Sequence, residues 1–115
     1  MAYPTGSGSE RLNRVFLDAQ SGGAHAILTV AANHIVTVLN VTICNMVATA
    51  YNTNLHVSAL GSTTVMLMEQ PLVLPATGTF VWNDKIVLIG TDVLKVYSAS
   101  TNYDVYCSYI DQDWS

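Results

Sequence analysis

The 115-residue chain is half hydrophobic and only 10% charged, and its formal net charge is −4. A chain of this length forms one domain with a modest core. Its four basic residues are too few for the phosphate contacts of a nucleic-acid-binding protein, and an anionic membrane surface is disfavoured for the same reason.

Residues 1–10 predict an extended N-terminal arm. They are small and polar, with Pro4, Gly6 and Gly8, and they offer almost nothing to bury. We expect this arm to be ordered only where a neighbouring molecule holds it. No leader pattern is visible, and no apolar run approaches the roughly 18 residues of a spanning helix, so we expect synthesis in a cytoplasm and no membrane partner.

Residues 11–115 predict a single all-β domain. The first two strand-like runs are 11–19 and 24–32, separated by Gln20-Ser-Gly-Gly23. In the first run Arg14 and Phe16 lie on one face, and Val15 and Leu17 lie on the other.

The run 34–46 is the longest strand candidate, and strict alternation gives it two apolar faces. Val36 and Val38 fall on one face, and Val41 and Ile43 fall on the other. A strand of this kind is either central in a sheet or has an outer face that meets another subunit. A helix is the rival interpretation because the run is long enough, but its density of β-branched residues argues for a strand.

The remaining runs are short, and each is closed by a turn signal such as Tyr51-Asn-Thr-Asn54 or Gly90-Thr-Asp92. Strand signals recur roughly every 8 to 12 residues, which is typical of a sandwich or barrel. The predicted fold is therefore an antiparallel, jelly-roll-like β-sandwich of about eight strands. The further strand candidates are 55–59, 63–69, 72–74, 80–89, 93–97 and 103–110.

The shortage of charge predicts that much of the surface is buried in an assembly. Obligate interfaces are more apolar and poorer in charge than free surface, so we expect contacts with further copies of the chain or with a partner. The alternative is a robust monomer with a surface of Ser, Thr and Asn.

The sequence shows no arrangement typical of an enzyme, a metal site or a cofactor site, and we expect none of these. His25, His34 and His56 follow no ligand spacing. Asp111 and Asp113 could offer two carboxylates to Ca²⁺, but a solvated tail is the simpler interpretation. The two cysteines are expected to be buried and unpaired, although a disulfide between neighbouring strands is possible; they are Cys44 and Cys107.

Aromatic residues crowd the last strands, and alternation places Tyr103 and Tyr109 on one face and Tyr106 on the other. The group has three interpretations: a stacking platform for a sugar or base, a subunit interface, or ordinary core and surface. Its members are Tyr97, Tyr103, Tyr106, Tyr109 and Trp114.

Both ends of the chain resemble a family of small virion structural proteins of tailed bacteriophages. The resemblance lies in the arm Pro4–Ser9, in Phe80-Val-Trp-Asn-Asp84, in Gly90-Thr-Asp92 and in Ser108-Tyr109-Ile-Asp111. It covers the arm and the last third, and it covers the middle only by pattern. It implies a β-sandwich without catalytic residues, located in the virion on the capsid surface or the tail.

From this resemblance we expect a capsid decoration, or cement, protein that bridges major capsid subunits as a homotrimer. The alternatives are a tail, neck or fibre-anchoring component and a host-glycan-binding head protein. The expected partners are further copies of the chain and the major capsid protein or tail and neck proteins. The candidate interface residues are Tyr3, Pro4, Arg11, Val36, Val38, Tyr106, Tyr109 and Trp114.

Overall fold

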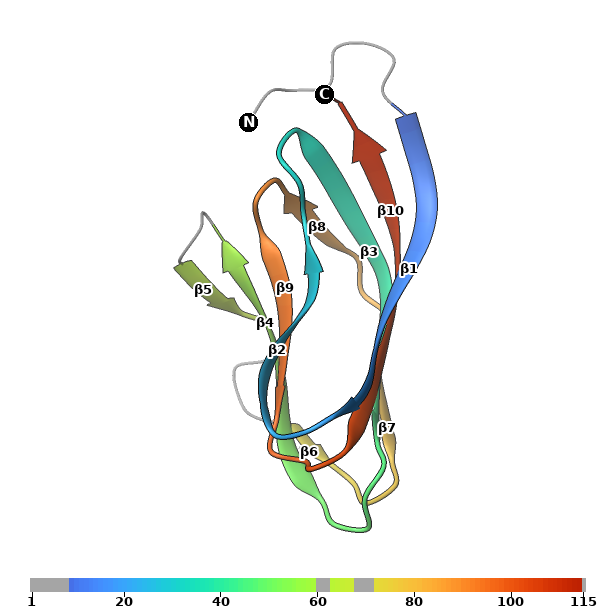
Figure 1. Ribbon diagram of the computed structural model, residues 1–115, viewed down its shortest axis with the longest axis vertical. Helices are drawn as coiled ribbons and strands as arrows, with labels where there is room; N and C mark the ends of the chain where they lie inside the picture. The colour runs from blue at the N-terminus through green and yellow to red at the C-terminus, as the bar shows by residue number, and fades with distance from the viewer. Residues whose placement is uncertain (1–8, 60–62, 68–71, 115) are drawn as a thin grey trace.

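The computed structural model describes residues 9–59, 63–67 and 72–114, and these residues form ten β-strands and no helix (Figure 1). The strands are β1 (Ser9–Gln20), β2 (Gly23–Thr29), β3 (His34–Asn45), β4 (Tyr51–Ala59), β5 (Thr63–Met66), β6 (Leu72–Leu74), β7 (Thr79–Trp82), β8 (Ile86–Ile89), β9 (Val93–Ser98) and β10 (Tyr103–Asp113). The all-β prediction is confirmed.

The strands form two five-stranded antiparallel sheets that face each other as a sandwich. One sheet has the order β1-β10-β3 followed by β7 and β8, which both pair with β3. The other has the order β2-β9-β4 followed by β5 and β6, which both pair with β4. Counting β5 with β6 and β7 with β8 as single broken strands, the ten strands occupy eight positions, which is the arrangement of a jelly roll.

β1 starts two residues before the predicted run, inside the segment assigned to the arm. Ser9 lies opposite Asp113 and Glu10 lies opposite Gln112 of β10. The amide of Gln112 also donates a hydrogen bond to the Glu10 carboxylate over 3.1 Å. A partner about one hundred residues away in sequence therefore recruits these polar residues into the sheet.

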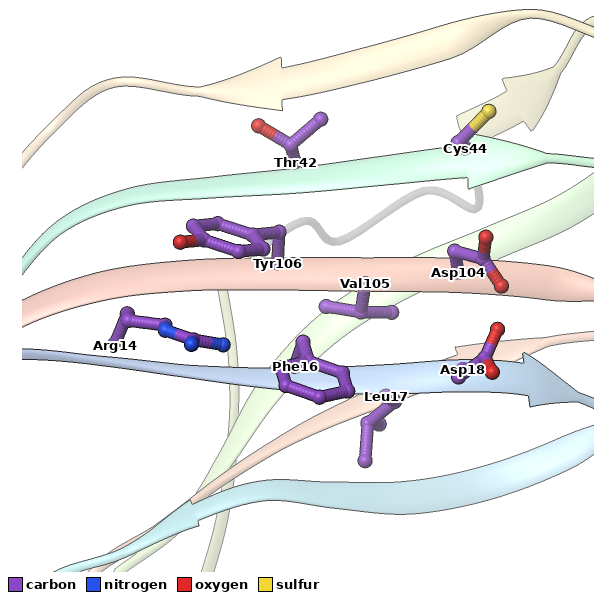
Figure 2. A pocket seen from close by; sticks show the side chains of 9 residues that line it. All are labelled: Arg14, Phe16, Leu17, Asp18, Thr42, Cys44, Asp104, Val105 and Tyr106. Carbon is purple, nitrogen blue, oxygen red and sulfur yellow. The ribbon is translucent and has the colours of Figure 1, made fainter.

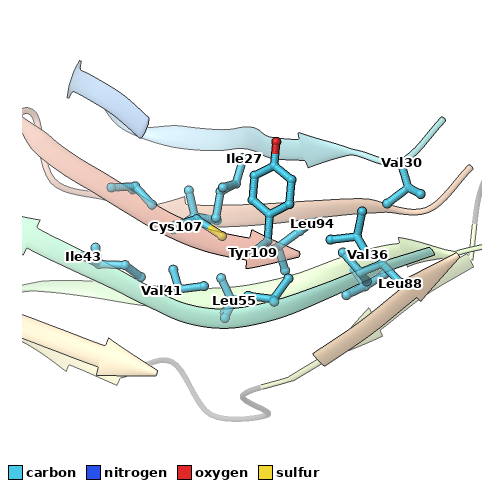
Figure 3. Packing of buried hydrophobic residues seen from close by; sticks show 14 of the residues in the cluster. Ile27, Val30, Val36, Val41, Ile43, Leu55, Leu88, Leu94, Cys107 and Tyr109 are labelled. Carbon is cyan, nitrogen blue, oxygen red and sulfur yellow. The ribbon is translucent and has the colours of Figure 1, made fainter. Parts of the chain in front are cut away.

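The core lies between the sheets and is built from their inward-facing side chains (Figure 3). β10 supplies Tyr103, Val105, Cys107 and Tyr109, as alternation predicts. Burial raises the pKa of Tyr103 to about 12, and its hydroxyl donates to the carbonyl of Gly23 over 3.3 Å. The core also includes Ile27, Val30, Val36, Val38, Val41, Ile43, Leu55, Val57, Leu74, Leu88, Leu94 and Val96.

The predicted faces of β3 are wrong because the strand contains a β-bulge. The register against β10 shifts between Ser108 and Tyr109, so Asn40 pairs with Ser108 whereas Val38 pairs with Tyr109. The extra residue turns both Val38 and Val41 inward, since a bulge reverses the alternation beyond it. Val36, Val38, Val41 and Ile43 are consequently all buried on one face of the strand.

The buried Asn45, at the end of β3, connects three loops at one end of the sandwich. Its side-chain amide donates to the carbonyl of Thr49 over 2.9 Å and to that of Pro75 over 3.1 Å. Its side-chain oxygen accepts from the Ser100 hydroxyl over 2.9 Å. Asn45 is only 1% exposed, so these hydrogen bonds replace the water that its polar atoms lose on burial.

Candidate interaction surface

The outer face of the sheet β1-β10-β3 carries a group of exposed apolar side chains. In register, Phe16 lies opposite Tyr106, Tyr106 lies opposite Thr42, and Thr42 lies opposite Val81. This row crosses the sheet, and Phe16 is 54% exposed and Tyr106 is 46% exposed. We call the exposed apolar side chains of this face the outer-face patch: Leu12, Phe16, Val81, Val87 and Tyr106.

A shallow hollow of about 410 Å³ lies within this face (Figure 2). Side chains from three neighbouring strands surround it: Arg14, Phe16 and Asp18 from β1, Asp104 and Tyr106 from β10, and Thr42 and Cys44 from β3. The hollow therefore depends on pairing between the start, the middle and the end of the chain.

Opposite charges occupy the two ends of the hollow. Figure 2 shows Arg14 at one end and Asp18 with Asp104 at the other. The guanidinium carbon of Arg14 lies 5.3 Å from the centre of the Phe16 ring, which is cation–π geometry. Asp104 accepts a hydrogen bond from the backbone N–H of Ala19 over 2.7 Å. Among the described residues the ion pairs all involve His34, so Arg14 has no carboxylate partner there.

Three of the predicted interface residues do not belong to an exposed face. Val36 is 2% exposed, Val38 is fully buried and Tyr109 is 9% exposed, and all three point into the core. For the two valines the cause is the bulge in β3, which aligns them with Val41 instead of the outer face. Their predicted place in a subunit interface is therefore corrected to a place in the core.

The other predicted residues are dispersed. Tyr106 belongs to the outer-face patch, and Arg11 is exposed on β1 opposite Asp111. Trp114 is partly buried after the end of β10, where its backbone N–H donates to the carbonyl of Asn33. Tyr3 and Pro4 lie outside the described residues.

The aromatic group near the C-terminus is not a single platform. Tyr103 and Tyr109 are core residues, whereas Tyr106 faces outward. Trp114 follows Tyr106 by eight residues along an extended chain, which is roughly 27 Å at 3.4 Å per residue. Rings so far apart do not stack on one sugar or base.

The sequence interpretation missed a contact between the start of β3 and the end of β10. His34 Nδ1 lies 2.8 Å from a carboxylate oxygen of Asp111, and Nε2 lies 3.5 Å from one of Asp113. The hydrogen bond with Asp111 raises the pKa of His34; burial opposes the rise, and the charges of Asp111 and Asp113 reinforce it. The two aspartates, expected in a solvated tail, thus hold the two strands together at their ends.

The two cysteines lie on adjacent strands but face opposite sides of the sheet. Cys44 lies opposite Asp104 on the outer face, whereas Cys107 lies opposite Val41 and points into the core. Both are free thiols, and burial raises the pKa of Cys107 to about 11. The expected burial is thus confirmed for Cys107 alone, because Cys44 is partly exposed.

The three histidines are separated in the fold. His25 hydrogen-bonds to the carbonyl of Ser21, and His56 hydrogen-bonds to the side chain of Asn54. Burial, with a contribution from Lys95, lowers the pKa of His56. Over residues 9–59, 63–67 and 72–114, no group of three or more His, Cys, Asp or Glu could hold a metal ion. The same ranges contain no helix with the length and hydropathy of a membrane span.

No protein-family model matches the sequence, and no curated protein matches it at a significant level. Among solved structures, the chain is similar to a chain of the Bacillus endospore appendages, described as disulfide-linked pili. The TM-score is 0.55 at 13% identity, and the match covers 100% of this chain and 97% of that one.

The chain is also similar to a chain in the acid-stable capsid of Helicobacter pylori bacteriophage KHP30. That TM-score is 0.54 at 14% identity, with 95% of this chain and 92% of the other covered. A chain in the capsid asymmetric unit of cyanophage Pam1 gives a TM-score of 0.40 at 12% identity, covering 98% and 92%. At these identities the first two similarities show a shared jelly-roll-like fold.

Proposed function

We propose that the chain is a structural subunit of a bacteriophage particle, and specifically a decoration protein that bridges major capsid subunits. The observation that carries the proposal is the outer-face patch on a chain with only 10% charged residues. Large exposed apolar groups mark interaction sites, so this face suits a subunit that works inside an assembly. The role is structural and not catalytic, and the protein acts as a homo-oligomer.

The similarity to a chain of the KHP30 capsid supports this proposal, because it extends over nearly the whole of both chains. The motifs at both ends of the sequence point to the same class of particle. The alternative location is the tail or neck, where such a subunit would be present in far fewer copies.

Copy number tests the proposal. Purified particles of the phage that encodes the chain are analysed by quantitative mass spectrometry, with the major capsid protein as the internal standard. A copy number comparable to that of the capsid protein is expected for decoration, whereas a few tens of copies would favour the tail or neck. Absence of the chain from the particles would overturn the proposal.

A second candidate is a subunit of a surface fibre, which the similarity to the Bacillus appendage chain favours. In that case the purified protein should form long helical filaments that are visible by negative-stain electron microscopy. Discrete particles of a few subunits across a range of protein concentrations would contradict the fibre role.

A further inference from the structure

We propose that the part of the outer-face patch around Phe16 and Tyr106 is a self-complementary contact, in which two copies of this chain pack face to face about a two-fold axis. The axis runs across the strands along the row of Phe16 and Tyr106. This contact does not depend on the proposed role in a phage particle, because it follows from the side chains of the face itself.

The residues of the outer face form rows across the sheet. Phe16 and Tyr106 are Cα partners in the central row, and Arg14 with Ser108 form the row on one side. On the other side lie Asp18 and Asp104, the latter opposite Cys44 of β3. Successive outward residues on a strand are roughly 7 Å apart. The face therefore carries an apolar row flanked by a positive row and a negative row.

This order of charge selects one way of pairing two copies. A two-fold axis along the apolar row reverses the strand direction between the two faces. Arg14 of each copy then lies over Asp18 and Asp104 of the other, while the aromatic rows meet in the middle. An axis parallel to the strands would instead place arginine over arginine and aspartate over aspartate, which is repulsive.

The single chain leaves these charges available. Arg14 rests on the Phe16 ring and has no carboxylate partner among the described residues. Asp18 is exposed, and Asp104 accepts a backbone hydrogen bond, which leaves its second oxygen open to a guanidinium. In an isologous contact each of these pairings occurs twice, once on either side of the axis.

The size of the face fits a modest dimer. Three rows at roughly 7 Å and four strands at about 4.8 Å span an area of roughly 400 Å² per copy, or about 800 Å² in total. That value is below the standard size of a specific interface, so the dimer should be weak and should dissociate on dilution.

Charge exchange tests the contact. One variant carries Arg14→Asp, and a second carries Asp18→Lys with Asp104→Asn, in which the amide oxygen still accepts from Ala19. Sedimentation equilibrium is measured for the wild type, for each variant and for their equimolar mixture. The wild type should approach twice the chain mass of 12.4 kDa as its concentration rises.

The dissociation constant of each variant alone should be at least about tenfold higher than that of the wild type, because like charges then face each other twice. The mixture should recover a dissociation constant within about threefold of the wild type, because opposite charges again face each other at both positions. Circular dichroism of every variant establishes that it is folded.

Two tyrosine variants distinguish dimerisation through this face from nonspecific association. Tyr106→Ala should weaken the dimer, whereas Tyr97→Ala should not, because Tyr97 is 38% exposed but lies on β9 in the other sheet. A monomer at every concentration would overturn the inference. A mass of three chains that is the same in the wild type and in the variants would also overturn it. So would a mixture of the two charge variants whose dissociation constant is no lower than that of either variant alone. A failure here leaves the copy-number test of the proposed function unaffected.

Discussion

His34 shows how one residue couples distant parts of this fold. It stands at the first position of β3, and its partner Asp111 lies near the end of β10, 77 residues later. The pKa of His34 is raised by the hydrogen bond with Asp111. A histidine whose pKa is raised on folding contributes stability that is complete below its unfolded pKa of about 6.5 and is lost as pH rises through the folded value.

We therefore expect the coupling between His34 and Asp111 to depend on pH. A double-mutant cycle with His34→Gln, Asp111→Asn and the double variant should give a coupling free energy of about 0.5 kcal/mol at pH 5.5. At pH 8.5 the coupling should be near zero, because the imidazole is then neutral. Urea unfolding at both pH values measures it, and a coupling that grew with pH would contradict the assignment.

Neither of these residues could be identified as a pair from the sequence. Their contact depends on the register between β3 and β10, and nothing in the local sequence around Asp111 specifies that register. The pattern around Asp92 was more informative. Asp92 belongs to the predicted turn Gly90-Thr-Asp92, and its carboxylate accepts a hydrogen bond from the N–H of Ile89 over 3.1 Å.

Among the strands, β10 follows the simple alternation of its sequence and β3 does not. The shared face of Tyr103 and Tyr109 was predicted, and both are buried together with Val105 and Cys107. The bulge beside Asn40 could not be predicted from alternation alone, because apolar residues occupy both odd and even positions of β3. When a strand has apolar residues at both odd and even positions, its sequence does not show where a bulge interrupts the alternation.

The bulge makes a specific prediction for Val38. Val38→Ala should lower the free energy of unfolding by about 2 kcal/mol, since it opens a cavity in the core. Val73→Ala, at a valine of β6 that is 58% exposed, should change the free energy of unfolding by no more than about 0.5 kcal/mol. Guanidinium unfolding of both variants makes the comparison, and equal losses would argue against the inward direction of Val38.

Replacing Asn45, which connects the three loops, should lower the free energy of unfolding more than Val38→Ala does. Asn45→Ala should cost about 3 kcal/mol, because the carbonyls of Thr49 and Pro75 and the hydroxyl of Ser100 would lose a buried partner together. The exposed Asn13 is the control, and Asn13→Ala should be nearly neutral. Chemical unfolding measures both, and a small effect at Asn45 would mean that water replaces its hydrogen bonds.

For the whole molecule, the sequence predicted the fold class and approximate strand number better than the candidate interaction surface. Eight positions of a jelly roll correspond to the predicted strand count, because turn residues interrupt the chain at regular intervals. The outer-face patch was missed as a unit, although Tyr106 was named. Phe16 and Tyr106 are 90 residues apart in sequence, and only the pairing of β1 with β10 makes them neighbours.

The expected role of the arm can be tested separately from the fold. Removing residues 1–8 should change the unfolding temperature by no more than about 3 °C, because pairing of β1 with β10 begins at Ser9. The same truncation should greatly reduce binding to particles that lack the protein, measured by co-sedimentation. Unchanged binding would contradict the expectation that a neighbouring molecule holds the arm.

The place of β9 and β10 in the two sheets has a consequence for how the protein is made. β10 lies between β1 and β3, and β9 lies between β2 and β4, so the last two of these ten strands in chain order form the middle of both sheets. During translation, the earlier strands lack β9 and β10, their main hydrogen-bonding partners, until residues 93–113 have left the ribosome. Both sheets are therefore completed only after residues 93–113 have been synthesised, and a chain that terminates before Tyr103 lacks the centre of the sheet that bears the outer-face patch.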